Sequence, residues 1–194
     1  MIRSGWKWTK HAAISRIAIL LGLLLLFPAL AKAEVTVSTS EKYYIVQGHT
    51  QAEILRSLHK HNGKYAALTH TTFKYSYTAR QRGKICTITD AKVFLHILYT
   101  YPRQVGAMDG PTRKWWKKAL KKLTAHELIH GQIARKAAHE LERELIGIHN
   151  EPCSAFKGIV KARANRIFQE NRRRQQEYDR LTKHGLKQER YRGD

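Results

Sequence analysis

Cysteine, proline and methionine are scarce in this chain of 194 residues, which contains two cysteines, four prolines and two methionines. The cysteines, Cys86 and Cys153, are too far apart in sequence to form a C-x-x-C redox motif or a zinc ribbon. Internal repeats and low-complexity segments are also absent from the sequence. In an oxidising compartment we expect the two cysteines to form a disulfide, and a free buried pair is the alternative.

Long apolar runs are lacking except for one, the eleven residues 17–27, which are too few to span a bilayer comfortably as a helix. Basic residues precede this run, and Ala31-Lys32-Ala33 follows it as an A-x-A cleavage site. Residues 1–33 are therefore predicted to be a signal peptide, with an uncleaved N-terminal anchor as the alternative. The mature protein is predicted to be exported, to the periplasm or out of the cell.

Acidic residues are few: 15 Asp and Glu stand against 36 Lys and Arg, so the formal net charge is +21. The predicted signal peptide holds five basic residues and no acidic ones, so the mature chain keeps a charge of +16. This charge favours acidic cell-envelope polymers or an anionic lipid surface as partners, and solubility alone is the alternative explanation. Export and the lack of a recognition motif argue against nucleic acid.

Hydrophobic periodicity predicts an α+β fold for the single mature domain. Thr50 and Glu53 have the spacing of a capping box at the start of one helix. Alternation predicts strands, and spacing by three and four predicts helices. We expect a small antiparallel sheet, formed as a hairpin or meander and packed against long helices. The predicted strands are 43–46, 66–78 and 85–89, and the last of these either ends there or continues to 99. Residues 34–42 are either a first strand or a loose leader. The predicted helices are 50–62, 109–147 and 153–182.

One motif in the third of these segments is typical of a metal site. The sequence reads His126-Glu127-Leu128-Ile129-His130, or H-E-x-x-H, and apolar residues recur every four positions from Ile129 to Leu145. On a helix, residues i and i+4 share a face, so His126 and His130 can bind one ion. Glu127 is rotated by about 100° and can act on a metal-bound water without ligating the metal. This arrangement is that of a zinc hydrolase.

A catalytic zinc site needs a third protein ligand. His139 is excluded because on an unbroken helix it lies about 13 Å along the axis from His130 and on the opposite side. The end of the last helix is a better source, because an antiparallel helix could bring it close to the motif. His184 there could be the ligand, with Asp179 and Thr182 nearby as partners, or it could simply cap the helix.

The order of these features resembles a known bacterial family. The features, over residues 43–187, are Tyr44-x-Val46-x-Gly48-x-Thr50, a β region rich in Thr and aromatics, Cys86, Trp115 or Trp116, H-E-x-x-H, Cys153 and Tyr178-Asp179-x-x-Thr182-x-His184-Gly185. They are similar to the predicted secreted zinc-dependent proteases, domain of unknown function 922. The resemblance implies a zincin-like metallopeptidase domain over 34–187 and a polar tail over 188–194. It also favours His184 as the third ligand, with Asp179 as the alternative.

These observations lead to two hypotheses about function. In the first, His126, His130 and His184 bind Zn²⁺, and Glu127 is the general base in the hydrolysis of a peptide or protein substrate. An oxyanion donor is also expected, and the sequence does not choose among Tyr75, Tyr77 and His70. In the second, the chain is a non-catalytic basic envelope-binding protein with a structural or vestigial metal site.

Overall fold

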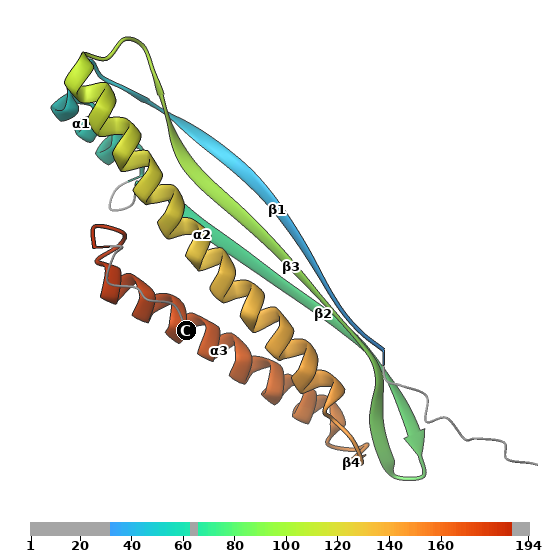
Figure 1. Ribbon diagram of the computed structural model, residues 1–194. Helices are drawn as coiled ribbons and strands as arrows, with labels where there is room; N and C mark the ends of the chain where they lie inside the picture. Colours follow the sequence, from blue (N-terminus) through green and yellow to red (C-terminus); the bar gives the residue numbers. More distant parts are fainter. Residues whose placement is uncertain (1–31, 63–65, 188–194) are drawn as a thin grey trace, which may run out of the picture. The chain divides into compact units, whose positions relative to one another are not determined.

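A small mixed sheet with long helices on one face forms the framework of the described residues, 32–62 and 66–187, in the computed structural model (Figure 1). The predicted tail 188–194 and residues 1–31 of the predicted signal peptide lie outside the described residues. Within the described part, none of the helices has the length and apolarity needed to cross a membrane. The elements in chain order are β1 (Lys32–Gln47), α1 (Gln51–Asn62), β2 (Leu68–Arg82), β3 (Ile85–Val105), α2 (Gly110–Ile146), β4 (Glu151–Pro152) and α3 (Phe156–Thr182).

The strand order is β1-β3-β2, with the short β4 paired to the beginning of β3. β2 runs antiparallel to β3, as predicted, but β1 runs parallel to β3, so the prediction of a purely antiparallel sheet was wrong. The reason is that β3 is the most apolar strand. Its alternate residues from Ala91 to Tyr101 are buried, whereas those of β1 and β2 are at most half-buried over most of their length. β3 therefore takes the centre, and β1 joins its free side instead of continuing a meander.

The core lies between the inner face of β3 and the helices α2 and α3. α2 presents small residues to the sheet, including Ala134 and Ala137, which allow the helix to approach it closely. α3 packs beside α2 and reaches β2 through aromatic contacts, such as the ring of Phe168 against that of Phe73, with centroids 5.5 Å apart. A second small core of Val46, Ile54 and Trp116 joins β1, α1 and α2.

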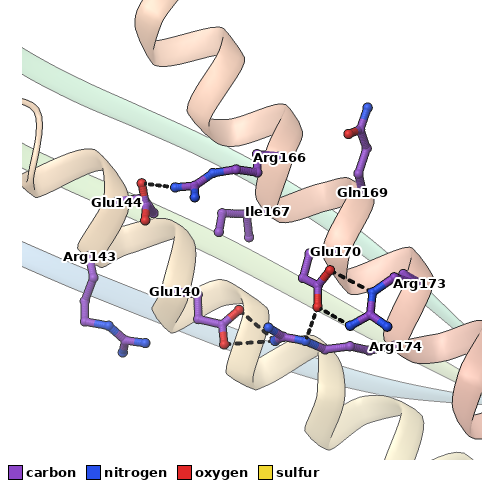
Figure 2. Close-up of a pocket in the computed structure, with 9 residues that line it drawn as sticks. All are labelled: Glu140, Arg143, Glu144, Arg166, Ile167, Gln169, Glu170, Arg173 and Arg174. Atoms are coloured by element: carbon purple, nitrogen blue, oxygen red, sulfur yellow. Dashed lines mark hydrogen bonds and ion pairs between the residues drawn. The ribbon is translucent and has the colours of Figure 1, made fainter.

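Ion pairs join α3 to α2, and the two helices run antiparallel, the arrangement that would bring the end of α3 close to the motif (Figure 2). The Arg174 guanidinium contacts the Glu140 carboxylate at 2.7 Å and also pairs with Glu170 on its own helix. Further towards the start of α3, Arg166 contacts Glu144 on α2 at 2.6 Å. Increasing residue numbers on α3 thus meet decreasing numbers on α2. These pairs fix which residues of α3 stand opposite the motif.

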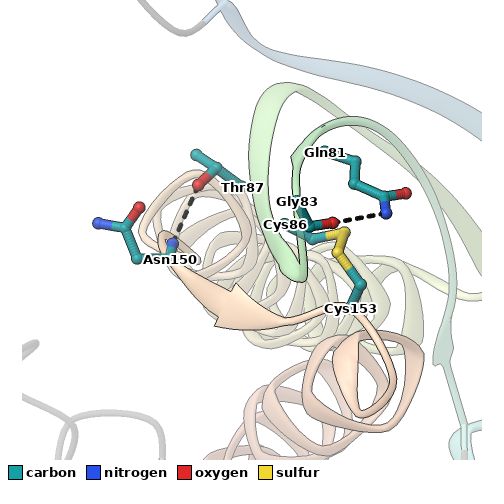
Figure 3. Close-up of a disulfide and its surroundings, with 6 residues drawn as sticks. All are labelled: Gln81, Gly83, Cys86, Thr87, Asn150 and Cys153. Carbon is teal, nitrogen blue, oxygen red and sulfur yellow. Dashed lines mark hydrogen bonds between the residues drawn. A yellow bond between two sulfur atoms is a disulfide. The ribbon is translucent and has the colours of Figure 1, made fainter.

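The Cys86–Cys153 disulfide is present, as predicted, and it anchors the beginning of α3 to the hairpin of β2 and β3 (Figure 3). The Cys153 amide also donates to the carbonyl of Lys84, at 2.9 Å, and the Asn150 amide donates to the hydroxyl of Thr87. The bond joins cysteines 67 residues apart, so loop entropy predicts a stabilisation of about 4 kcal/mol. One end of α3 is therefore fixed covalently, and the other end carries the candidate site.

Gly131, directly after the motif, is required by the close approach of α2 to β3. A Cβ atom on Gly131 would lie 2.0 Å from the hydroxyl oxygen of Tyr99, a buried residue whose ring stacks on that of Tyr101. We expect Gly131→Ala to lower the free energy of unfolding by about 1–3 kcal/mol, despite the better helix propensity of alanine. Urea unfolding followed by circular dichroism measures this loss.

Gly158 in α3 provides the matched control for Gly131, because an added Cβ there meets nothing within 4 Å. Gly158→Ala should raise the free energy of unfolding by about 0.5–1 kcal/mol, the difference in helix propensity. Tyr99→Phe combined with Gly131→Ala should restore part of the lost stability, since it removes the oxygen atom. Equal effects of alanine at the two glycines would show that helix packing at Gly131 is not tight.

Candidate metal centre

His126 and His130 lie one turn apart on α2, which runs unbroken through the motif. Their rings meet edge to face, with centroids 4.7 Å apart. The helix begins earlier, where the Asp109 carboxylate accepts a hydrogen bond of 2.6 Å from the Thr112 amide. Thr124 and Glu127 also have the spacing of a capping box, but they lie inside α2, so the Glu127 carboxylate does not cap the beginning of a helix. All three polar residues of the motif are thus available in the middle of a regular helix.

Asp179 on α3 completes a set of three atoms with the spacing of metal ligands. Its Oδ1 lies 3.1 Å from Nε2 of His126 and 3.1 Å from Nε2 of His130, and the two nitrogens are 3.2 Å apart. Tetrahedral zinc with bonds of about 2.0–2.1 Å holds its ligand atoms roughly 3.3 Å from each other. Two imidazole nitrogens and a carboxylate oxygen are also ligands that zinc accepts. The donor set and its geometry therefore fit this ion.

A surrounding layer of hydrogen bonds orients both imidazoles. The Thr182 hydroxyl donates to the carbonyl of Tyr178 at 2.8 Å, so its oxygen can accept from Nδ1–H of His126, 3.5 Å away. The Gln175 carbonyl oxygen accepts from Nδ1–H of His130, and its amide donates to the backbone carbonyl of His130 at 3.0 Å. A tautomer with the proton on Nδ1 of both rings would leave the Nε2 lone pairs for a metal ion, whereas Nε2–H can donate to Asp179 when no metal is bound. Such partners are typical of metal-binding histidines.

The electrostatics of the three residues are coupled. Burial alone would raise the pKa of the Asp179 carboxyl, but hydrogen bonds from His126 and His130 outweigh it and hold that pKa far below its usual value. Burial alone would lower the pKa of His130, but Asp179 and Gln175 outweigh it and raise that pKa. Without metal, the negative charge of Asp179 thus favours a proton on His130. A metal ion would have to displace this proton, so its affinity should fall as the pH decreases through the pKa of His130.

Glu127 lies beside this group without belonging to it. Its side chain is buried, and the Thr69 hydroxyl on β2 donates to Oε2 at 2.6 Å. Both residues line a cavity of about 550 Å³ together with the three candidate ligands. The remaining lining comes mainly from the beginning of β2 and the end of α3: Ala66, Ala67, Leu68, Thr71, Leu123, Gln175, Lys183, His184 and Leu186. A carboxylate, a possible metal site and open space thus adjoin one another.

The sequence favoured His184 as the third ligand, with Asp179 as the alternative. In the structure, Asp179 is the residue whose side chain contacts both imidazoles. Gln175, Tyr178, Asp179 and Thr182 follow one another at helical spacing, which turns all four towards α2. His184 lies beyond the end of α3, in a turn where Lys183, His184 and Gly185 all have positive φ. Its Nδ1 is 3.4 Å from Oδ1 of Asp179, and its side chain is 57% exposed. It therefore lies at the rim, outside the set of three mutually close ligand atoms.

Gly185 allows the turn after α3 to lie close to His126. A Cβ atom on Gly185 would lie 3.2 Å from Cγ of His126, and its φ of +84° suits glycine. The turn therefore packs against the ring of a candidate ligand. Tyr178 stacks on the same ring, with centroids 4.7 Å apart. Tyr178 and Gly185, at the end of α3 and in the turn after it, thus both pack against the ring of His126.

The three residues considered as oxyanion donors, Tyr75, Tyr77 and His70, do not line this cavity. Tyr75 and Tyr77 pack against Phe168 and Phe156 of α3, at centroid distances of 6.4 Å and 6.1 Å, and serve the core. His70 alternates with Thr69 along β2, so its exposed side chain points to the other face of the sheet. Sequence analysis missed Thr69 and Gln175. The spacing of four between Gln175 and Asp179 was a usable signal, whereas Thr69 is one threonine among several in a strand.

An α+β domain with a His-His-Asp cluster and an adjoining buried glutamate is the class that the fold and the site define. A family model described as "Bacterial protein of unknown function (DUF922)" matches residues 41–185. The chain belongs to this family, which confirms that part of the resemblance. Comparisons with curated proteins and with solved structures gave no match.

Proposed function

We propose that this protein is a zincin-like zinc metallopeptidase that acts after export, in the periplasm or outside the cell. His126, His130 and Asp179 would hold Zn²⁺, and Glu127 would be the general base. The observation that carries the proposal is the triangle of ligand atoms, with sides of 3.1–3.2 Å, beside a buried carboxylate that is not part of it. A structural zinc site has four protein ligands, whereas three leave a position for water.

The residues of the chain divide the chemical work between them. When bound, zinc would polarise a carbonyl group and lower the pKa of a water molecule to about 7. Glu127 would accept a proton at its carboxylate and return it to the leaving amine. Thr69 holds Oε2 of Glu127, which leaves Oε1 to carry the proton. Thr182 and Gln175 keep the two histidines in the tautomer that ligation requires.

The surroundings of the cavity suit an extended peptide. β2 lies at the edge of the sheet, and its first residues line the cavity, so a substrate chain could pair with its outer edge. Leu68 and Leu123 line the same space, and Leu186, which is 78% exposed, stands at its rim. These side chains favour a substrate with an apolar residue next to the cleaved bond.

The proposal is tested by metal analysis combined with a peptide-library assay. Purified protein should contain one zinc per chain, and mass spectrometry should show cleavage of library peptides. Chelation should stop cleavage, and added zinc should restore it. Stoichiometric zinc without turnover on any peptide would instead support the non-catalytic envelope-binding function.

Thr69 should matter for turnover and not for metal. We expect Thr69→Val to lower kcat/KM about 10- to 100-fold, because it removes a hydrogen bond to a charged carboxylate and lets Glu127 move. Zinc content should stay at the wild-type level, and Thr69→Ser should retain most activity. Thr71→Val is the matched control, since Thr71 lines the same cavity from the same strand face. A similar loss at both threonines would argue against a specific role for Thr69.

A further inference from the structure

The first half of α2 carries an unusual concentration of positive charge. Between Asp109 and Glu127 the sequence has no acidic residue. It has six basic ones, all with exposed side chains, which we call the basic face: Arg113, Lys114, Lys117, Lys118, Lys121 and Lys122. The second half of the same helix is different, because its glutamates pair with arginines of α3 (Figure 2). The excess of charge is therefore confined to one part of the helix.

This arrangement is unfavourable for the helix by itself. Like charges repel at i and i+4, as in Arg113 and Lys117 or Lys117 and Lys121. Cations also oppose the helix dipole in the first turns. The nearest carboxylates are engaged elsewhere: Asp109 caps α2, and Glu53 accepts hydrogen bonds from the backbone at the start of α1. Within residues 32–62 and 66–187, no carboxylate forms an ion pair with the basic face. An external anion would relieve this repulsion.

Apolar side chains lie next to the basic face. Leu128 is an apolar residue in the middle of α2, yet it is 46% exposed. With Leu120 and Ala125 it lines a shallow cavity of about 460 Å³, whose other walls include Lys117 and Lys121. Basic residues around exposed apolar ones are the pattern by which helices bind at a membrane surface. A hydrophilic acidic polymer would gain nothing from the leucines.

From this geometry we infer that the first half of α2 docks the protein on an anionic lipid surface. The lysines contact the charged headgroups, and Leu128 enters the boundary between headgroups and acyl chains. Neither the metal nor catalysis takes part, so the inference is independent of the proposed function. Charge complementarity and the adjoining apolar cavity together select lipid as the partner.

Vesicle co-sedimentation of the full chain tests this inference. Wild-type protein should bind vesicles that contain equal parts of phosphatidylglycerol and phosphatidylcholine much more strongly than phosphatidylcholine alone. Binding to the neutral vesicles accounts for any charge-independent contribution. The five basic residues in 1–33 also attract anionic vesicles, so the same measurements are made on the predicted mature chain, residues 34–194. The variant K114Q/K117Q/K118Q/K121Q should lose anionic binding by about fivefold per lysine, hence by on the order of 100-fold or more in total. Added salt should weaken the wild-type binding.

Two further variants decide between explanations. K84Q/K157Q/K161Q/R172Q removes the same charge from exposed positions outside the basic face and should retain most of the binding. Equal losses in the two fourfold variants would overturn the inference, because net charge alone would then explain binding. Leu128→Ser should weaken vesicle binding severalfold and leave binding to soluble polyglutamate unchanged. An unchanged vesicle affinity of this variant, or no preference for anionic vesicles in the wild type, would overturn the lipid assignment.

Discussion

Replacing Asp179 with alanine should raise the dissociation constant for zinc by about a thousandfold. The replacement removes one of the three proposed ligand atoms, which lie 3.1–3.2 Å from each other. Loss of an outer partner of a ligand already costs about 10- to 100-fold, so the loss of a ligand itself should exceed that. Competition with a fluorescent chelator measures the constant.

The informative comparison for Asp179 is His184. His184→Ala should change the zinc affinity by less than about tenfold, because a rim histidine is not needed to complete the set. Asp179→Asn removes the negative charge and keeps the volume of the side chain, so it tests the carboxylate without leaving a cavity. Circular dichroism shows whether each variant is folded. Were His184→Ala to lose zinc while Asp179→Ala keeps it, the ligand favoured by the sequence would be the correct one.

Replacing Glu127 with glutamine should lower kcat by about a thousandfold and leave zinc bound. A general base contributes about 10²–10⁴ to rate, and glutamine cannot take the proton. The side chains have nearly the same shape, and the glutamine carbonyl can still accept the hydrogen bond from Thr69. Peptide hydrolysis and metal content are measured on the same preparation.

His126→Ala serves as the reference for Glu127→Gln. It should lose zinc and turnover together, because His126 is one of the three proposed ligands. A Glu127→Gln protein with wild-type turnover would contradict the role of Glu127, whatever the metal content. A Glu127→Gln protein without zinc would place the carboxylate among the ligands. The two variants therefore separate binding of the metal from its use.

Much of the local structure could be predicted from the sequence. The capping box of Thr50 and Glu53 forms, because the Glu53 carboxylate accepts from the Thr50 amide at 3.1 Å and the Thr50 hydroxyl accepts from the Glu53 amide at 3.4 Å. The motif helix and the disulfide were also predicted, because helical periodicity and cysteine pairing are properties of the chain itself. The parallel pairing of β1 was not, since the order of strands depends on how well each buries its inner face.

The sequence alone determined that His126 and His130 share one helix face, because their separation of four residues closely matches the period of an α-helix. It could not determine which residues of other helices and strands contact these two histidines. Asp179 and Gln175 come from α3, and Thr69 comes from β2, and each reaches the site only because the core, the Arg174–Glu140 ion pair and the disulfide set the position of α3 and the sheet against α2. Contacts between distant segments depend on the packing of whole elements, so only the tertiary structure decided that Asp179 lies against the two histidines and that Thr69 binds Glu127.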